Sequence, residues 1–221
     1  MDLQVLFKSN TLIKAKYDFT VAQNRLLQKV FYEIQKNKTN IATIDTMELK
    51  KIIKYKDANT IPGLKTFLNN LKENEIMQIK SNKSWTVVNV ISGFSYVEEE
   101  NKFEIEIPIL LLKLIREYTE TGFTPTNVTK YISLGATNAQ RFYELLRMWT
   151  GNKEIIEYSL EEIKEYLLLQ DKYKVFSDFR KWVIEPAIKE LKEKELLDIY
   201  DVEYIKTGRK VTSIKFYVKD L

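Results

Sequence analysis

Two neighbouring stretches near the end of this 221-residue chain hold the side chains with the clearest chemical use, and most of them are cationic. In the first stretch, residues 173–191, the polar candidates for contact are Lys174, Ser177, Asp178, Arg180 and Lys181. Lysine and arginine bind phosphate, and arginine also forms paired hydrogen bonds with the O6 and N7 atoms of guanine. These residue types therefore predict contact with a nucleic acid.

The second stretch is the turn between two β-type runs, Asp198 to Ile205 and Val211 to Val218. It reads Lys-Thr-Gly-Arg-Lys, and its cationic candidates are Lys206, Arg209 and Lys210. A helix followed by a hairpin with a basic tip is typical of the end of a winged-helix domain. In that arrangement the helix and the hairpin reach a major groove and its flanking phosphates together.

The first stretch has the periodicity of one long helix. The apolar residues that form a stripe at helical spacing are Phe176, Phe179, Val183, Ala187 and Leu191. Pro186 lies inside this helix, where it cannot donate an amide hydrogen bond to the carbonyl of Trp182. We therefore expect a kink there, with the N-terminal half free to enter a groove while the remainder stays on the core.

The composition excludes several kinds of site. The chain has no histidine and no cysteine, which rules out disulfides, zinc sites built on these residues and histidine-based acid–base catalysis. The acidic residues are scattered, so we expect no enzyme activity, no catalytic or metal-binding residue and no cofactor. The net charge of +4 permits a nucleic-acid partner without requiring one. No apolar run approaches the roughly 20 residues of a membrane span and no signal peptide is evident, so we expect a cytoplasmic protein.

The remaining sequence alternates helical and extended patterns. In the first half, the expected helices are 20–36, 46–53, 60–73 and 109–118, and the expected strands are 41–44, 76–79, 84–97 and 103–107. A dense cluster of chain breakers at 119–126 marks the expected domain boundary. We therefore expect two domains, 1–120 and 121–221, each long enough to bury its own core.

The second half repeats the element order of the first. Asp45-x-x-Glu48 and Ser159-x-x-Glu162 both have the spacing of a capping box. Each follows a helix and a short β-run, and each precedes a further helix and a hairpin. This order, present twice, predicts an α+β chain of two tandem winged-helix domains, that is, helix-turn-helix domains with a β-hairpin wing.

Three segments resemble one known family, the plasmid replication initiator (Rep) proteins, which have two winged-helix domains and bind directly repeated iteron DNA. The first runs from Leu12 to Leu27, and the second is Arg-Phe-Tyr-Glu-Leu-Leu at 141–146. The third starts at Ile163 and contains Phe-Arg-Lys-x-Val-Ile-x-Pro-Ala at 179–187, which is the most specific of the three. Asn24 departs from the family pattern, which often has an acidic residue at that place.

This resemblance implies that the helix at 173–191 is the main reader of bases and that the hairpin tip lies on the DNA backbone or in a minor groove. Two further candidates for DNA contact are Arg141, in the second segment, and Lys65, in the first-domain helix that corresponds to the reader. The first domain would serve dimerisation and auxiliary DNA contact, since the acidic turn at 98–100 cannot bind phosphate. The implied partners are double-stranded DNA with direct repeats, a second copy of the chain in equilibrium with the monomer, and host replication proteins.

The function that follows is initiation of plasmid replication at repeated DNA, with repression of the protein's own promoter by the dimer. Two other interpretations stay open. A winged-helix transcriptional regulator without a replication role would look the same in sequence, but it would bind an inverted repeat as a stable symmetric dimer. A pure protein-interaction module would show no salt-dependent affinity for DNA.

Overall fold

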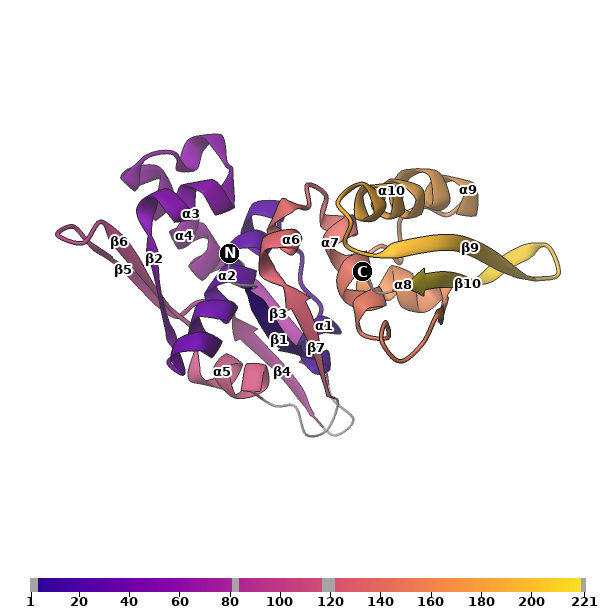
Figure 1. The fold of residues 1–221 in the computed structure, drawn as a ribbon, viewed down its shortest axis with the longest axis horizontal. Coiled ribbons are helices and arrows are strands. Elements are labelled where there is room, and N and C mark those ends of the chain that lie inside the picture. Colours follow the sequence, from indigo (N-terminus) through magenta and orange to yellow (C-terminus); the bar gives the residue numbers. More distant parts are fainter. Residues whose placement is uncertain (1–3, 81–83, 117–121, 220–221) are drawn as a thin grey trace. The chain divides into compact units, whose positions relative to one another are not determined.

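The computed structural model of the chain describes residues 4–80, 84–116 and 122–219. The chain separates into two compact units, Met1–Ile132 and Ser133–Leu221. Each unit combines helices with antiparallel strands, and each contains helices followed by a β-hairpin wing (Figure 1). The predicted α+β fold with two winged-helix domains is thereby confirmed. Within the described ranges, no helix is both long and apolar enough to cross a membrane.

The first unit is built around one long helix and several short strands. Its helices are α1 (Asn10–Ile13), α2 (Val21–Asn37), α3 (Thr46–Ile53), α4 (Ile61–Asn74), α5 (Ile109–Arg116) and α6 (Val128–Ser133), with a 3-10 turn at Lys56–Ala58. Its strands are β1 (Val5–Ser9), β2 (Ile41–Asp45), β3 (Ile76–Lys80), β4 (Trp85–Asn89), β5 (Gly93–Val97), β6 (Lys102–Glu106) and β7 (Phe123–Asn127). Strands β2, β6 and β5 form an antiparallel sheet in that order, and the β5–β6 hairpin is the wing of this unit.

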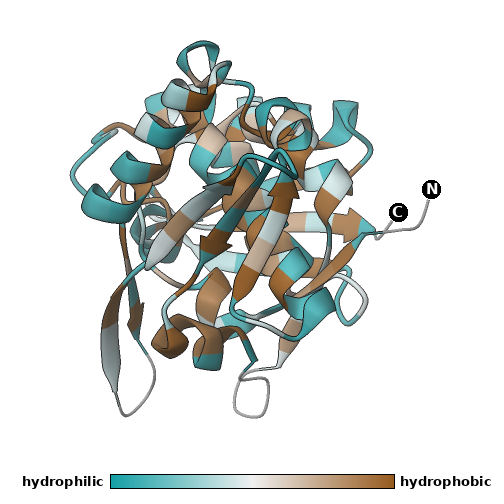
Figure 2. Cartoon of the chain, turned by 90° about the vertical axis from the view of Figure 1, so that its left-hand side faces the viewer, coloured by the Kyte–Doolittle hydropathy of each residue, from teal (hydrophilic) through white to brown (hydrophobic). Residues whose placement is uncertain are grey.

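Helix α2 passes through the core of the first unit, and residues 23–31 along it are all buried. A capping box fixes its start, because the Thr20 hydroxyl accepts from the amide of Gln23 while the Gln23 side chain accepts from the amide of Thr20. Hydrophobic and hydrophilic stretches alternate along the helices of this unit (Figure 2). That alternation is the pattern of helices that pack one face on a core.

A buried cation joins α2 to α3. Lys29 is 3% exposed, and its Nζ atom lies 2.7 Å from a carboxylate oxygen of Glu33 and 2.7 Å from one of Glu48. Burial lowers the pKa of Lys29, but its hydrogen bonds to the two carboxylates outweigh that effect and raise the pKa above its ordinary value. The ammonium therefore stays charged and ties the two helices together.

The two predicted capping boxes form to different extents. At the start of α3, Asp45 accepts from the amides of Met47 and Glu48, which caps the helix. The carboxylate of Glu48 turns to Lys29 instead of completing the box. At the second place, Ser159 and Glu162 form both reciprocal hydrogen bonds. The capping-box spacing thus predicts where both helices start. Whether the glutamate side chain completes the box depends on which other groups lie within its reach.

Because of strand β7, the division between the two units lies later in the chain than expected. The strand lies largely within the cluster of breakers at 119–126 and pairs antiparallel with β1, placing Pro125 opposite Phe7. Because this ladder ties the segment to the N-terminal strand, the first unit extends to Ile132, beyond the boundary expected at 120. Residues 119–121 of the expected boundary, and residues 117–118 of the helix expected at 109–118, lie outside the described ranges.

The single strand expected at 84–97 is instead two strands in different sheets. β4 pairs with β3, whereas β5 pairs with β6, and the link between them includes the buried Val90 and Ile91. One face of the β3–β4 hairpin packs inward, and the opposite face exposes Ile76, Trp85 and Val87. These three side chains give the hairpin an apolar outer face.

The second unit repeats the winged-helix order in a smaller form. Its helices are α7 (Thr137–Arg147), α8 (Leu160–Tyr166), α9 (Phe176–Phe179) and α10 (Glu185–Glu193), with a π-helical turn at Arg180–Ile184 between the last two. Its strands are β8 (Ile155–Ser159), β9 (Asp198–Thr207) and β10 (Lys210–Lys219), which form an antiparallel sheet in the order β8-β10-β9. The core lies between this sheet and the helices, where Phe142 of α7 meets Phe216 of β10 edge to face at 5.9 Å between ring centroids.

Candidate nucleic-acid interface

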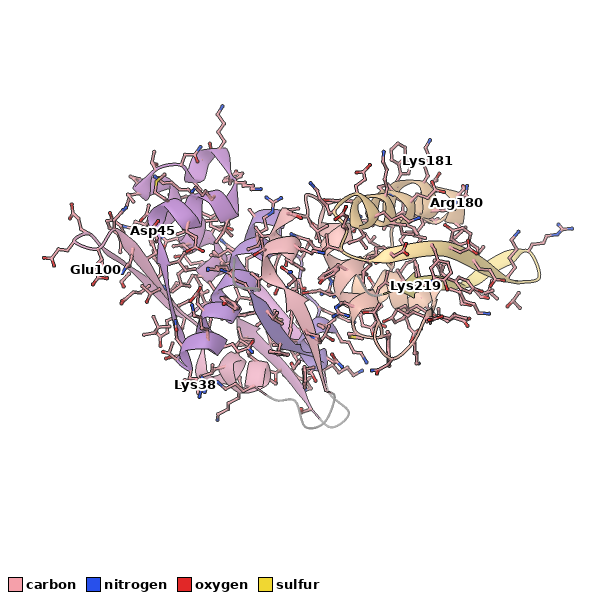
Figure 3. The ribbon with its side chains drawn as sticks, viewed as in Figure 1. Lys38, Asp45, Glu100, Arg180, Lys181 and Lys219 are labelled. Carbon is pink, nitrogen blue, oxygen red and sulfur yellow. The ribbon has the colours of Figure 1, made fainter. Side chains whose placement is uncertain are left out.

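The predicted reader stretch forms a helix with one buried and one exposed side. Phe179, Val183, Ala187 and Leu191 are buried, as the apolar stripe predicts, and Phe176 is half-buried. The five polar candidates all have exposed side chains: Lys174, Ser177, Asp178, Arg180 and Lys181. The helix begins at Phe176 after the N-cap Val175, so Lys174 lies just before it. Figure 3 shows Arg180 and Lys181 projecting from this helix.

The interruption expected at Pro186 takes the form of a π-helical turn. In the turn at Arg180–Ile184, the amide of Glu185 donates to the carbonyl of Arg180, five residues back. A wider turn accommodates a proline, which has no amide hydrogen to donate and whose ring crowds the carbonyl four residues earlier. The helix continues beyond it as α10 (Figure 1). π-Helical turns are frequent at functional sites, and this one carries two of the candidate residues.

Arg180 connects the reader helix to the wing. Its Nε atom lies 3.1 Å from Oε1 of Glu185, and its guanidinium carbon lies 5.8 Å from the ring centroid of Tyr204 on β9. Phe176 meets the same ring edge to face at 5.2 Å. Burial and the nearby Glu185 carboxylate both raise the pKa of the Tyr204 hydroxyl. With a side chain 48% exposed, Arg180 covers part of the domain with its stem and still presents its guanidinium to solvent.

Two exposed apolar side chains accompany these cations, and the charge pattern of the sequence does not single them out. Trp182 is 59% exposed, and the Nζ atom of Lys181 lies 4.8 Å from its ring centroid. Val175, at the start of the helix, is 58% exposed. The sequence does contain a signal for them, because both residues are large and apolar but fall outside the predicted buried stripe.

The wing of the second unit is the β9–β10 hairpin, with Lys206, Arg209 and Lys210 exposed at its tip as predicted. Strand β8 pairs with β10 only from Ser213 to Tyr217, so the tip extends beyond the three-stranded part of the sheet. Gly208 begins the turn with φ +62°, a left-handed conformation that glycine adopts without steric cost. The turn chemistry therefore places three cations at the end of a projecting hairpin.

Arg141, predicted as a DNA contact, is instead buried in the second unit with 3% of its surface exposed. Its Nη2 atom donates to the carbonyl of Tyr166 at 3.0 Å, and its Nη1 atom lies 3.4 Å from a carboxylate oxygen of Glu144. We therefore remove Arg141 from the candidate interface, because its guanidinium joins α7 to the end of α8. Lys65 lies on the exposed side of α4 in the first unit, as expected from helical spacing.

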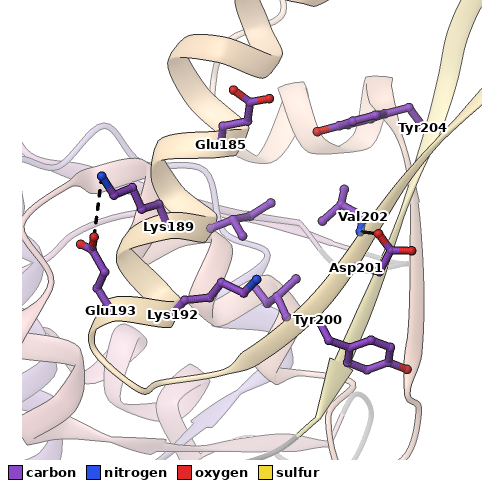
Figure 4. Close-up of a pocket in the computed structure, with 10 residues that line it drawn as sticks. Glu185, Lys189, Lys192, Glu193, Tyr200, Asp201, Val202 and Tyr204 are labelled. Carbon is purple, nitrogen blue, oxygen red and sulfur yellow. Dashed lines mark hydrogen bonds and ion pairs between the residues drawn. The ribbon is translucent and has the colours of Figure 1, made fainter.

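An open groove of about 510 Å³ lies between α10 and β9 in the second unit. Apolar residues such as Ile188 and Ile199 line it together with charges of both signs, among them Lys189, whose Nζ atom lies 3.7 Å from Glu193 (Figure 4). Across the described part of the chain, no group of three or more acidic residues is arranged to hold a metal ion. The exposed cations of the reader helix and wing are therefore the chemically distinctive surface of this unit.

Two winged-helix units in one chain, the second with a basic helix and a basic wing, define a class of protein. Residues 5–147 match the family described as "Initiator Replication protein, WH1", and residues 159–218 match "Initiator Rep protein, WH2". The chain belongs to this family of initiator replication proteins. A comparison with curated proteins gave no match.

Solved structures share the fold. The Pi initiator protein, in a crystal structure of its complex with iteron DNA, is 18% identical with a TM-score of 0.79, over 100% of this chain and 99% of that one. A structure of domains 2 and 3 of RctB is 12% identical with a TM-score of 0.52, over 93% of this chain and 85% of that one. At these identities, the similarity shows the arrangement of the backbone.

Proposed function

We propose that this protein initiates plasmid replication by binding repeated (iteron) double-stranded DNA at an origin. The observation that carries the proposal is the exposed basic side of the reader helix, joined through Arg180 and Tyr204 to a wing with a basic tip. A helix of this kind fits a major groove, while the wing lies on phosphates beside it. Membership of the initiator replication family and the fold shared with an initiator solved on iteron DNA support the same role.

Within this function the individual residues take different tasks. Arg180 is the residue suited to guanine, since its guanidinium can donate two hydrogen bonds to one base, and Glu185 holds it in position. Lys181 and Lys174 are suited to phosphate, and Asp178 can accept from the amino group of cytosine. Lys206, Arg209 and Lys210 bind backbone at the wing. The proposal assigns no covalent chemistry and no cofactor to the chain, and its place of action is the cytoplasm.

The first unit is proposed to make protein contacts, including a homodimer that represses the protein's own promoter, and to give auxiliary DNA contact through Lys65. Its wing ends in Glu98, Glu99 and Glu100, which repel phosphate. The outer face of the β3–β4 hairpin, with exposed Trp85 and Val87, suits contact with a second copy or a host replication protein. Sedimentation of wild type and of a Trp85→Ser, Val87→Ser variant tests this surface, and an unchanged dimer fraction would remove it from the proposal.

The test of DNA binding is fluorescence anisotropy on duplexes that carry the direct repeats next to the protein's gene. Scrambled duplexes and an inverted-repeat arrangement serve as competitors, at two salt concentrations. We expect specific binding to the direct repeats, and we expect its affinity to fall steeply with salt because cations on phosphates displace counterions. Preference for an inverted repeat would favour a transcriptional regulator instead.

The variant that tests the helix is Arg180→Ala with Lys181→Ala. Its matched control is Lys192→Ala with Lys194→Ala, which removes the same charge at the C-terminal end of α10. We expect the first pair to lose specific binding and the second to lose about threefold or less, as a loss of non-specific phosphate attraction alone. Equal, weak binding of the wild type to all duplexes would overturn the proposed function.

A further inference from the structure

The exposed side of the reader helix is apolar as well as basic. The core of the second unit is filled by the buried stripe that includes Phe179 and Val183, so the domain does not need Trp182 or Val175 for its packing. More than half of each side chain is exposed. Isolated exposed apolar residues are common on proteins, but a tryptophan on a helix that also exposes Lys174, Arg180 and Lys181 favours a partner with both apolar and anionic groups.

Charge identifies the kind of partner. Lys181 places its ammonium 4.8 Å from the Trp182 ring centroid, and Lys174 lies next to Val175 in the sequence. Trp182 thus has a cation beside it in space, and Val175 has one beside it in the sequence. In a DNA major groove, phosphates border the base edges, and the C5-methyl group of thymine is the one apolar group that a base presents there.

We infer that Trp182 and Val175 read thymine by contact with its C5-methyl group, a role that rests on the proposed function and extends it. Arg180 then supplies the hydrogen bonds that recognise guanine, while Trp182 and Val175 supply the apolar contacts that recognise thymine. Val175 is the N-cap that precedes the helix and Trp182 lies in its π-helical turn, so the two side chains are placed to contact different bases. We therefore expect a separate methyl contact for each of the two side chains in a repeat.

The experiment removes single methyl groups from the DNA. Each thymine of one repeat is replaced in turn by deoxyuridine, which keeps base pairing and deletes only the C5-methyl group. Anisotropy titrations then give the affinity of the full-length protein for each duplex. For the wild type we expect about a fourfold loss at one or two positions, the effect of exposing a group the size of one CH₂, and no change elsewhere.

The variants assign those positions to side chains. In Trp182→Ala the deoxyuridine effect should disappear at one position, and in Val175→Ala it should disappear at the other. Trp182→Phe keeps an aromatic ring and should retain part of the effect, which keeps the test usable when the alanine variant binds too weakly. The control is Tyr200→Ala, which removes an exposed aromatic ring from β9 of the same unit and should keep the wild-type profile.

The outcomes separate this inference from the proposed function. When no duplex is bound specifically, the proposed function fails and the inference fails with it. When repeats are bound specifically but deoxyuridine has no effect at any position, or the same effect in wild type and in Trp182→Ala and Val175→Ala, methyl reading is wrong and the proposed function stands. Trp182→Ala that keeps the full thymine profile but no longer binds vesicles of anionic lipid would assign the tryptophan to a membrane surface and overturn the inference.

Discussion

The wing of the first unit ends in Glu98, Glu99 and Glu100, whereas the wing of the second ends in Lys206, Arg209 and Lys210. Both wings are antiparallel hairpins that follow helices in the same order. The helices before them also differ, because α4 exposes few cations while the reader helix exposes Lys174, Arg180 and Lys181. One backbone plan therefore carries two wing tips of opposite charge, for which we propose different partners.

The two units also share an internal feature, since each buries a cation on the helix that precedes the first strand of its winged sheet. Lys29 of α2 contacts Glu48 of α3, and Arg141 of α7 contacts the carbonyl of Tyr166 at the end of α8. Both cations are 3% exposed. Each unit therefore buries a cation that joins this helix to the next one, although the outer surfaces of the two units differ.

The largest expected effect tests this internal parallel. Arg141→Met should lower the free energy of unfolding of the second unit by about 3 kcal/mol, because Glu144 has no exposed surface and would lose its cation. Lys29→Met should cost the first unit less, about 2 kcal/mol, because Glu48 is 44% exposed and can turn to water. Urea unfolding followed by circular dichroism measures both. An Arg141→Met variant of normal stability that loses specific DNA binding would restore the assignment made from sequence.

A somewhat smaller effect tests the basic wing. The triple change Lys206→Glu, Arg209→Glu, Lys210→Glu should weaken binding to the repeats about 50-fold at physiological salt, since it reverses three charges that we propose to face phosphate. The salt dependence should also fall, by about 0.9 in the logarithmic slope for each phosphate that is no longer neutralised. Anisotropy at several salt concentrations measures this, and an unchanged melting temperature confirms that the exposed tip does not affect folding. Wild-type affinity would show that the wing lies away from DNA.

The reverse exchange tests the acidic wing. Glu98→Lys, Glu99→Lys and Glu100→Lys together should raise affinity for DNA of any sequence by only about threefold at low salt, and the gain should vanish at high salt. Filter binding on scrambled duplexes gives the comparison. A gain as large as the loss from the basic wing would mean that the two tips are equivalent, and the contrast between the units would then be one of charge alone.

The smallest effect concerns Lys65 on α4. Lys65→Ala in α4 should reduce affinity for the repeats by about twofold or less, because its proposed phosphate contact is auxiliary. Lys181→Ala should reduce affinity by about fivefold, because its proposed phosphate contact lies beside the base-reading Arg180. Parallel titrations at one salt concentration decide this. An equal loss in both variants would place the first unit on DNA to the same extent as the second.

Much of the fold follows from local patterns in the sequence. Thr20, Asp45 and Ser159 are recognisable as helix starts because an N-cap depends on residues within one turn. The tip of the second wing is predictable in the same way, since Gly208 marks the turn and the cations that flank it stay exposed to solvent. Such features need no knowledge of distant parts of the chain.

The features that sequence reasoning misses all depend on distant partners. Periodicity cannot show that β7 pairs with β1 or that Glu48 turns to Lys29. Arg141 has the type of a DNA contact, and only the positions of Glu144 and of the Tyr166 carbonyl show that it is a core residue. At the candidate site, a search for charges finds the cations but omits Trp182, although the predicted apolar stripe already leaves this residue outside the buried face of the helix.

The β1–β7 pairing also bears on the order in which the protein can fold during synthesis. Val5 lies opposite Asn127, so the ladder closes a loop of more than a hundred residues. Closing such a loop costs chain entropy before the contacts of the ladder can offset that cost. Contacts this distant in sequence therefore slow folding. A ribosome must therefore release the chain beyond Asn127 before the first unit can be completed. A fragment that ends at residue 120 would lack β7 altogether and leave β1 as an unpaired edge, open to association with other chains.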